Sequence, residues 1–587
     1  MTETEVAADT LLAGLDPEQR EVALATRGAV CVLAGAGTGK TRAITHRIAY
    51  AAAIGVVNPA HVLALTFTVR AAGELRGRLR QLGAAQVRAS TFHAAALRQL
   101  TYFWPRVIGG RPPQLIDTKL SLVREAAKQA RVHVDGPGLA DAASEIEWAK
   151  TTQIRPESYV RAAAAAGRSP VAGAAAMAAV YDGYERLRRE RHLIDFESVL
   201  ELTAAIVLEH RGAAQAVRDT FRYFVVDEYQ DVNPLQKLLL DAWLGDRDEL
   251  CVVGDPHQVI YSFTGATSDY LTGFTAEFPD ATLVRLVRDY RSTPQVVAVA
   301  GQLMRSGPAL VAQRPPGPQP VLTQYADDAD EAAGVVVQIR GLIASGVAAR
   351  QIAVLVRVNA DTGRFEQALT EAAVPYVVRG AERFFERPLV RQALVLFRGA
   401  ARGEAAIADA PDGRDPLPSA VRHVLTGIGF DGHPPAGGSA ARERWESLAA
   451  LAQLADDMYA ARPQASLGEF AAELTLRAEL GHAPPAEGVT LASMHAAKGL
   501  EWDAVFLPGL VEGLMPIVHA KTPAAIEEEG RLLYVAVTRA RRHLYLSWSQ
   551  GRAAARQRSR FLEGVRLGGP GPVRVPGKAT VKGREGG

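Results

Sequence analysis

The chain has 587 residues, about four times the roughly 150 residues of a typical domain, so several domains are expected. Hydrophobic residues make up 48% and charged residues 22%, which is typical of a globular protein and excludes a disordered one. The net charge of +2 neither requires nor excludes a nucleic-acid partner, because such a partner needs only a local basic track.

The sequence gives no sign of secretion or of a membrane-spanning helix. It lacks a run of about 18 apolar residues, and its first ten residues are acidic and contain no apolar block. Cys31 and Cys251 each lie inside an apolar run, which excludes a disulfide framework. We therefore predict a cytoplasmic protein.

Short apolar runs of the kind that form buried parallel strands fall into two clusters along the chain. The first cluster comprises Ala29–Leu33, His61–Phe67, Phe221–Val226 and Leu250–Val253. The second comprises Gln351–Val356, Val374–Val378, Val489–Met494, Ala504–Leu507 and His543–Trp548. Because helical patterns such as Ala71–Leu82 and Leu235–Leu244 separate many of these runs, we predict an α/β fold with two parallel-sheet cores.

Each predicted core is interrupted by a mostly helical insertion. The first core is expected to span 1–110 and 192–285, with its insertion at 111–191. The second core is expected to span 286–390 and 486–565, with a short insertion at 391–485. Within that insertion, residues 401–440 are dense in Gly, Pro and Asp and are predicted to be a loop. Residues 566–587 are predicted to be a disordered basic tail.

A glycine-rich loop follows the first predicted strand and precedes a predicted helix, Arg42–Ala53, which is the context of a phosphate-binding loop. Its backbone N–H groups and the helix N-terminus attract phosphate oxygens. Lys40 is expected to reach the β- and γ-phosphates of a nucleoside triphosphate, and the Thr41 hydroxyl to bind Mg²⁺. The residues of this loop are Ala34, Gly35, Ala36, Gly37, Thr38, Gly39, Lys40 and Thr41.

Two adjacent carboxylates, Asp227 and Glu228, end the apolar strand Phe221–Val226. Successive side chains at a strand end point apart, so the two acids can take different roles. We expect Asp227 to hold Mg²⁺ and Glu228 to orient and deprotonate the attacking water. Together with the phosphate loop, this pair predicts a nucleoside triphosphatase.

Several longer strings are more specific, and they occur in a defined order. They are Val226–Asp231 (VDEYQD), Gly254–Gln258 (GDPHQ), Tyr290–Thr293 (YRST), His495–Glu501 (HAAKGLE) and Val537–Ala540 (VTRA). Together they resemble the motifs of superfamily 1 DNA helicases of the UvrD/PcrA/Rep type, and the alanine- and arginine-rich composition resembles that of actinobacterial members. The resemblance extends from about Leu15 to about Trp548.

This resemblance implies two RecA-like P-loop domains, each with a helical insertion, and ATP bound in the cleft between them. It also implies ATP-driven translocation along single-stranded DNA in the 3′ to 5′ direction, with unwinding of tailed duplexes. The implied setting is DNA repair or replication at the bacterial nucleoid, with repair proteins as further partners. The sequence does not indicate the oligomeric state.

Roles at the nucleotide follow from the resemblance, motif by motif. Gln19 would read the adenine edge, and Arg42 and Tyr290 would sandwich the base. Glu501 would contact the ribose side. The γ-phosphate would be sensed by Gln258 and stabilised by two arginine fingers, Arg291 and Arg539.

Base stacking on the DNA strand requires aromatic platforms, and the candidates are Phe67, Tyr261 and Phe263. Packing in the core is the alternative interpretation of each ring. Phosphate or base-edge contacts are expected from Thr66, His93 and His495.

The sequence also departs from the family at points that bear on unwinding. Thr264 stands where the family usually has an arginine, which removes one charged contact, and the second insertion is shorter than in the best-known members. Two alternatives to a strong helicase therefore stay open. One is a DNA-stimulated translocase that displaces proteins and unwinds weakly. The other is a nucleotide-gated DNA-binding regulator.

Overall fold

The computed structural model describes residues 3–134, 136–170, 172–304, 309–379, 388–407, 417–430, 448–449, 451–452, 454–456, 458–459, 462–479, 488–551 and 555–565. The chain forms two compact units, Met1–Tyr290 and Arg291–Gly587. The predicted basic tail, 566–587, lies outside the described residues. None of the helices within the described ranges is both long and apolar enough to span a membrane.

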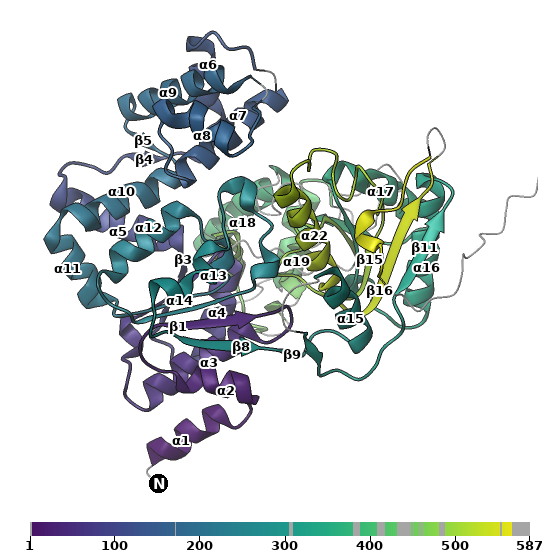
Figure 1. The fold of residues 1–587 in the computed structure, drawn as a ribbon, viewed down its shortest axis with the longest axis horizontal. Helices are drawn as coiled ribbons and strands as arrows, with labels where there is room; N and C mark the ends of the chain where they lie inside the picture. Colours follow the sequence, from purple (N-terminus) through teal and green to yellow (C-terminus); the bar gives the residue numbers. More distant parts are fainter. Residues whose placement is uncertain are drawn as a thin grey trace, which may run out of the picture. The chain divides into compact units, whose positions relative to one another are not determined.

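The first unit is built on a six-stranded sheet of order β3-β2-β6-β7-β1-β8, in which every neighbouring pair is parallel (Figure 1). Its strands are β1 (Val30–Ala34), β2 (Val62–Thr66), β3 (Arg88–Thr91), β6 (Tyr223–Val226), β7 (Leu250–Gly254) and β8 (Thr282–Leu286). The outer strands β3 and β8 were not predicted, because polar residues interrupt their apolar character.

Both faces of this sheet are buried, since alternate strand residues enter two different cores. Cys31, Leu63 and Phe224 belong to one core and Val32, Ala64 and Cys251 to the other. Both cysteines are buried free thiols. The helices of this unit outside its insertion are α1 (Glu3–Leu12), α2 (Pro17–Leu24), α3 (Lys40–Ala53), α4 (Val69–Gln81), α5 (Phe92–Val107), α10 (Phe196–Glu209), α11 (Arg211–Thr220), α12 (Pro234–Leu244), α13 (Asp269–Thr272) and α14 (Phe274–Glu277).

Between β3 and β6 the chain forms a group of helices, which Figure 1 shows gathered beyond α5, α10 and α12. This group has its own core around Trp148, Tyr159 and Tyr184. Its elements are β4 (Gln114–Leu115), α6 (Leu120–Gln129), α7 (Gly136–Thr151), η2 (Pro156–Ser158), α8 (Tyr159–Ala165), α9 (Ala174–Glu190) and β5 (Leu193–Ile194).

A buried ionic network joins this group of helices to α10. Lys150 Nζ lies 2.9 Å from Glu185 Oε1 on α9 and 2.9 Å from Oδ2 of Asp195, the N-cap of α10. Tyr184 OH donates to the same Asp195 oxygen at 2.7 Å. Because each charge is paired, the network fixes the orientation of the helices relative to α10.

The second unit contains another six-stranded parallel sheet, of order β11-β16-β15-β12-β14-β13. Its strands are β11 (Val321–Tyr325), β12 (Ile352–Val356), β13 (Tyr376–Arg379), β14 (Val489–Ser493), β15 (Trp502–Leu507) and β16 (Ala540–Ser549). Helices in the same unit include α15 (Pro294–Leu303), α16 (Asp328–Ala344), α17 (Thr362–Glu371) and α22 (Pro523–Val537). Two parallel sheets with helices between most successive strands confirm the predicted fold class.

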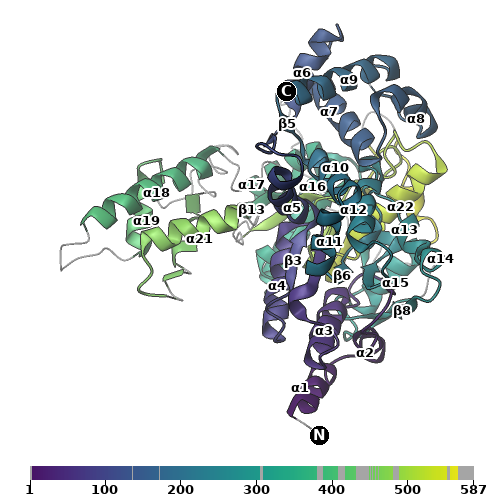
Figure 2. The same cartoon turned by 90° about the vertical axis from the view of Figure 1, so that its left-hand side faces the viewer.

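The described part of the second insertion packs as helices around Phe397, Val421 and Phe470 (Figure 2). These helices are α18 (Pro388–Ile407), α19 (Leu417–Thr426) and α21 (Leu467–Glu479). The prediction of a loop at 401–440 is therefore wrong in part, because α18 extends into this range and α19 lies within it. Leu417, Val421 and Leu425 repeat at helical spacing on α19 and are buried, and this burial outweighs the surrounding Gly and Pro.

Candidate active site

The glycine-rich loop joins β1 to α3 at the carboxyl end of the first sheet. Gly37 and Gly39 have φ angles of 73° and 80°, which glycine adopts without steric cost. Thr38 Oγ1 donates to Gly35 O at 2.9 Å and closes the turn. The helix begins at Lys40, with Gly39 as its N-cap, so the positive end of its dipole faces the loop. This is the local geometry of an anion site.

Gln19 of α2 lies against this loop and is almost fully buried. Its Nε2 donates to Thr38 O at 3.0 Å, and a Cβ at Gly39 would lie only 2.6 Å from that nitrogen. Asp16, the N-cap of α2, accepts from Gln19 N at 2.7 Å and fixes the start of the helix. The residue predicted to read adenine is thus held beside the phosphate loop.

The two residues predicted to sandwich the base also lie near this loop. Arg42 Nη2 donates to Gly14 O at 2.6 Å. Tyr290 N donates to Gly37 O at 2.9 Å, and its hydroxyl donates to Asp16 Oδ2 at 2.7 Å. Tyr290 is 44% exposed, as a ring that stacks on a ligand must be.

Both predicted acids follow β6. Asp227 N donates to Leu65 O at 2.9 Å, which anchors the strand end. Glu228 has a φ angle of 53°, in the left-handed region that a residue with a side chain adopts at an energetic cost. Burial and the neighbouring Glu228 carboxylate raise the pKa of Asp227 to about 7.

Lys40 meets these acids directly. Its Nζ lies 3.2 Å from Glu228 Oε2. Burial by itself would lower the pKa of Lys40, but Glu228, Asp255 and Asp227 together raise it above its usual value. Lys40 therefore stays protonated at neutral pH and can hold an anion.

A chain of hydrogen bonds connects Gln258 to the same carboxylate. Gln258 Nε2 donates to Asp255 Oδ2 at 2.8 Å, Asp255 N donates to Gln230 Oε1 at 3.0 Å, and Gln230 Nε2 donates to Glu228 Oε2 at 2.6 Å. Gln230 and Asp255 were not predicted as site residues, although both lie inside the quoted strings VDEYQD and GDPHQ. These three hydrogen bonds link the predicted phosphate sensor, Gln258, to the predicted base, Glu228.

In the second unit, Glu501 is shared between two arginines. Arg291 Nε pairs with Oε2 of Glu501, and Arg541 Nη2 lies 2.6 Å from Oε1. Burial alone would raise the pKa of Glu501, but Arg291 and Arg541 lower it below its usual range. Arg541 was not predicted, because a pair 40 residues apart leaves no local signal.

Arg539 is almost completely buried, with 2% of its surface exposed. Its Nε donates to Val535 O at 2.8 Å, Nη1 to Leu500 O at 3.2 Å and Nη2 to Thr538 Oγ1 at 3.0 Å. In this conformation the guanidinium ties the end of α22 to the loop before β15. Action as an arginine finger would require this side chain to exchange these partners.

The predicted stacking rings differ in exposure. Phe263 is 49% exposed and lies in η5 (Ser262–Thr264), with its ring centroid 6.1 Å from that of Tyr261. Phe67 is half-buried and packs against Phe92, with centroids 6.4 Å apart. Thr66 is buried, and its hydroxyl donates to Thr68 O at 3.0 Å. Phe263 is therefore the ring most accessible to a base.

The two predicted DNA-contacting histidines are neutral at pH 7. Burial and Lys119 lower the pKa of His93 to about 4, and burial and Arg357 lower that of His495 to about 4. His93 also lies edge-on to Phe196, with ring centroids 6.0 Å apart. Each neutral imidazole can donate or accept a hydrogen bond but carries no charge.

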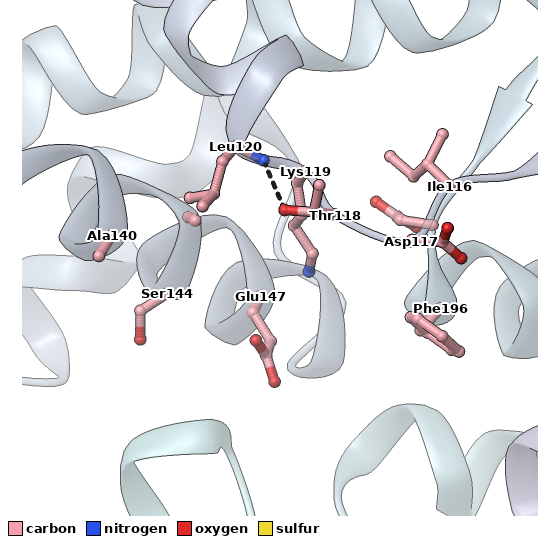
Figure 3. A pocket seen from close by; sticks show the side chains of 11 residues that line it. Ile116, Asp117, Thr118, Lys119, Leu120, Ala140, Ser144, Glu147 and Phe196 are labelled. Carbon is pink, nitrogen blue, oxygen red and sulfur yellow. Dashed lines mark hydrogen bonds between the residues drawn. The ribbon is translucent and has the colours of Figure 1, made fainter. Parts of the chain in front are cut away.

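A cavity of about 300 Å³ opens beside Phe196 and is lined by residues from the start of α6, from α7 and from the start of α10 (Figure 3). Lys119 lines it, but this lysine is paired with Glu197 at 2.7 Å, and Asp117, Glu147 and Asp195 also line the wall. The excess of carboxylates disfavours a phosphate backbone there. We therefore do not assign this cavity to the DNA strand.

Comparison with known proteins places the chain in a family. The family model for the UvrD/REP helicase N-terminal domain matches residues 15–279, and that for the UvrD-like helicase C-terminal domain matches 284–408 and 420–551. The chain belongs to the UvrD/REP helicase family, which confirms the predicted class of ATP-dependent DNA helicase.

Individual relatives are similar over nearly the whole chain. The ATP-dependent DNA helicase UvrD2 of Mycobacterium tuberculosis is 51% identical, covering 95% of this chain and 83% of the relative. UvrD1 of the same species is 29% identical, covering 95% and 86%. PcrA of Staphylococcus epidermidis is 27% identical, covering 95% and 87%.

Proposed function

We propose that this chain uses ATP hydrolysis to move 3′ to 5′ along single-stranded DNA and to unwind tailed duplexes in DNA repair or replication. The observation that supports this most directly is the chain of contacts from Lys40 through Glu228 to Gln258. These contacts connect the proposed phosphate-holding group, the proposed general base and the proposed phosphate sensor within one unit. The relatives that carry the name ATP-dependent DNA helicase support the same proposal.

The donor groups near the loop suit ATP together with Mg²⁺. Lys40 and the backbone N–H groups of the loop would bind the phosphates, and Thr41 and Asp227 would hold the metal. The Asp227 carboxyl fits this role because it is buried and its pKa is raised to about 7, so a cation beside it would favour the ionised form. When bound, Mg²⁺ would neutralise charge on the β- and γ-phosphates.

The remaining nucleotide contacts are proposals of the same kind. Gln19 reads the base edge, Arg42 and Tyr290 stack on its two faces, and Glu501 contacts the ribose side. Gln258 senses the γ-phosphate and passes that signal to Glu228 through Gln230 and Asp255. The groups proposed to stabilise the transferring phosphate are Arg291 and Arg539.

For the DNA strand, we propose stacking on Phe67, Tyr261 and Phe263 and polar contacts from Thr66, His93 and His495. The exposed ring of Phe263 supports this most strongly. Because DNA is the proposed substrate, we place the enzyme at the nucleoid in the cytoplasm, with repair proteins as possible partners.

We also propose the division of the chain into working parts. The ATP-binding core comprises 1–110 and 192–285, with its helical insertion at 111–191. The second core comprises 286–390 and 486–565, with its insertion at 391–485. The parallel sheets around β1 and β12 support this division.

The second candidate function is translocation along DNA with weak unwinding. Thr264 lacks the charge that the family usually has at this position, and the second insertion is short, so translocation that displaces proteins with little strand separation fits these two features. A regulator without turnover fits less well, because Glu228, Gln258, Arg291 and Arg539 are all present.

Unwinding of duplexes with either a 3′ or a 5′ single-stranded tail tests the proposal. We expect ATP-dependent strand separation only with the 3′ tail. Separation only with the 5′ tail would contradict the polarity. DNA-stimulated hydrolysis without separation on either substrate would favour the translocase, and hydrolysis that DNA does not stimulate would favour the regulator.

A further inference from the structure

Two consecutive carbonyl groups near the proposed DNA-stacking ring accept hydrogen bonds from the first insertion. Phe263 O accepts from Arg168 Nη1 at 3.3 Å, and Thr264 O accepts from Thr151 Oγ1 at 2.8 Å. Thr151 ends α7, and Arg168 follows α8. Tyr261–Gly265, which we call the 261–265 segment, is thus fastened by side chains more than 90 residues earlier in the chain.

Arg168 is held rigidly before it reaches this segment. Its Nη2 lies 2.8 Å from Glu145 Oε1, and its Nε lies 3.1 Å from both oxygens of that carboxylate. The guanidinium carbon also lies 4.4 Å from the centre of the Trp148 ring. Since only 17% of this side chain is exposed, Arg168 is set to hold the backbone rather than to reach for a ligand in solution.

Thr151 is equally constrained. It is buried, and the backbone opposite it is so close that a Cβ at Gly265 would lie 3.0 Å from Thr151 Oγ1 and 2.8 Å from Thr152 Cγ2. Gly265 also has a φ angle of 93°, which favours glycine. The end of α7 therefore closes tightly over the 261–265 segment.

The 261–265 segment follows one group that the proposed function uses and contains another. Gln258, the proposed phosphate sensor, is buried three residues before Tyr261. Phe263 presents a ring that is 49% exposed. Any shift of the segment's backbone would move this ring, because the side chain has only two rotatable bonds between the backbone and the ring.

We propose that Thr151 and Arg168 are positioning residues that fix the backbone of the 261–265 segment and thereby set the affinity for single-stranded DNA. This rests on the proposed function, in which Phe263 stacks on a base. Neither residue needs to touch DNA. The first insertion then acts on DNA binding through its hold on Phe263 O and Thr264 O.

Three variants at two adjacent positions distinguish this positioning role from an effect on the overall stability of the fold. The Thr151 hydroxyl also lies 3.0 Å from Trp148 O within α7. Thr151→Val keeps the shape of the side chain but removes the donor to both carbonyl groups, whereas Thr151→Ser keeps the hydroxyl. Thr152→Val is the matched control, because the Thr152 hydroxyl, just past the end of α7, donates to two carbonyl groups of that helix, Trp148 O at 2.6 Å and Ala149 O at 3.3 Å. The readouts are the concentration of an oligothymidylate for half-maximal ATPase stimulation, the rate at saturating DNA, and Tm.

We expect Thr151→Val to raise the half-maximal DNA concentration about tenfold, as loss of a buried hydrogen bond does, while the rate at saturating DNA is retained. Thr151→Ser should restore the value within about threefold, and Thr152→Val should leave it unchanged. Arg168→Lys should also raise it, because a lysine cannot bond to both Glu145 oxygens and Phe263 O in this fixed geometry.

A double-mutant cycle tests whether Thr151 acts through the ring. If it does, Thr151→Val should add little to the loss already caused by Phe263→Ala, so the two effects are not additive. Additive losses would overturn the proposed route through Phe263.

The outcomes distinguish this proposal from the proposed function. Hydrolysis by the unaltered chain that DNA does not stimulate would contradict the proposed function and this inference with it. DNA-stimulated hydrolysis with the same half-maximal DNA concentration in Thr151→Val would contradict this inference alone. A parallel fall in Tm and in the rate at saturating DNA would assign Thr151 a merely structural role and would also overturn it.

Discussion

Lys40 Nζ lies 3.2 Å from Glu228 Oε2, so the proposed phosphate-holding group and the proposed general base form one ion pair. Glu228 Oε2 also accepts from Gln230 Nε2 at 2.6 Å. A γ-phosphate bound to Lys40 would compete with Glu228 for the ammonium group. Phosphate binding would thereby release one hydrogen bond to the carboxylate and make it a better proton acceptor.

Glu228→Gln is expected to keep ATP binding and to abolish most turnover. The amide can still accept from Lys40 and Gln230, but it cannot take a proton from water. We expect DNA-stimulated kcat to fall by about 10²- to 10⁴-fold, with the Kd of a fluorescent ATP analogue changed by less than about fivefold. Glu74→Gln, which alters an exposed carboxylate beside Arg70, is the control. A kcat near that of the unaltered chain would remove Glu228 from its assignment as base.

Arg291 and Arg541 offer a matched pair, because each is bonded to a different oxygen of Glu501. If, of these two arginines, Arg291 acts on the transferring phosphate and Arg541 does not, Arg291→Ala should lower kcat about 10³-fold or more. Arg541→Ala removes a comparable ion pair and should change kcat by less than about tenfold. The measurement is steady-state ATP hydrolysis at saturating ATP and DNA. Equal losses in the two variants would show that support of Glu501, rather than a finger role, explains the effect.

The ring of Tyr290 is expected to contribute more to ATP affinity than its hydroxyl does. The hydroxyl donates to Asp16 Oδ2 at 2.7 Å on a half-exposed side chain, so Tyr290→Phe should raise the KM for ATP by less than about threefold. Tyr290→Ala removes the stacking surface and should raise the KM by about tenfold, if stacking on adenine resembles stacking on other bases. Equal effects of Tyr290→Phe and Tyr290→Ala would assign the residue to the Asp16 contact instead, because both variants lack the hydroxyl.

The features that could be predicted from sequence are those encoded locally. The loop before Lys40 and the acids after Val226 occupy fixed places beside apolar strands, so their strings alone indicate where they lie. Strand β3, at the sheet edge, escaped prediction because its residues Arg88–Thr91 carry no apolar run. Helix α19 was missed because Gly and Pro around it concealed a short buried stripe.

Contacts between distant residues could not be predicted in the same way. Nothing near Arg539 indicates that its guanidinium is buried against Val535 O and Leu500 O, because burial depends on how α22 packs. Likewise, Arg168 and Thr151 have no motif, and their contacts with the 261–265 segment appear only when the insertion is folded. Motifs indicate which groups perform the chemistry, and the fold determines which groups hold them in place.

Phe263 should contribute measurably to DNA affinity, whereas another exposed ring in the same unit should not. Tyr102 is 53% exposed and packs with Arg106, away from any predicted motif, so Tyr102→Ala controls for loss of an exposed aromatic side chain. Stacking of one base contributes about 1–3 kcal/mol, so Phe263→Ala should weaken binding of a labelled oligothymidylate by about 5- to 150-fold in fluorescence anisotropy. Equal affinities of the two variants would show that Phe263 is not a stacking platform.

His93 and His495 should make the fold sensitive to acid. Burial, assisted by Lys119 and Arg357 respectively, lowers the pKa of each to about 4, whereas the unfolded chain has a histidine pKa of about 6.5. The unfolded chain therefore binds more protons between these values. The stability contributed by the neutral imidazoles is complete above about pH 6.5 and is lost as the pH falls towards 4. We expect Tm to fall between pH 7 and pH 5, and to fall less in His93→Gln and His495→Gln.

His133→Gln, at an exposed position, controls for the loss of one histidine. A Tm profile that is the same in all four proteins would show that neither imidazole controls the acid response.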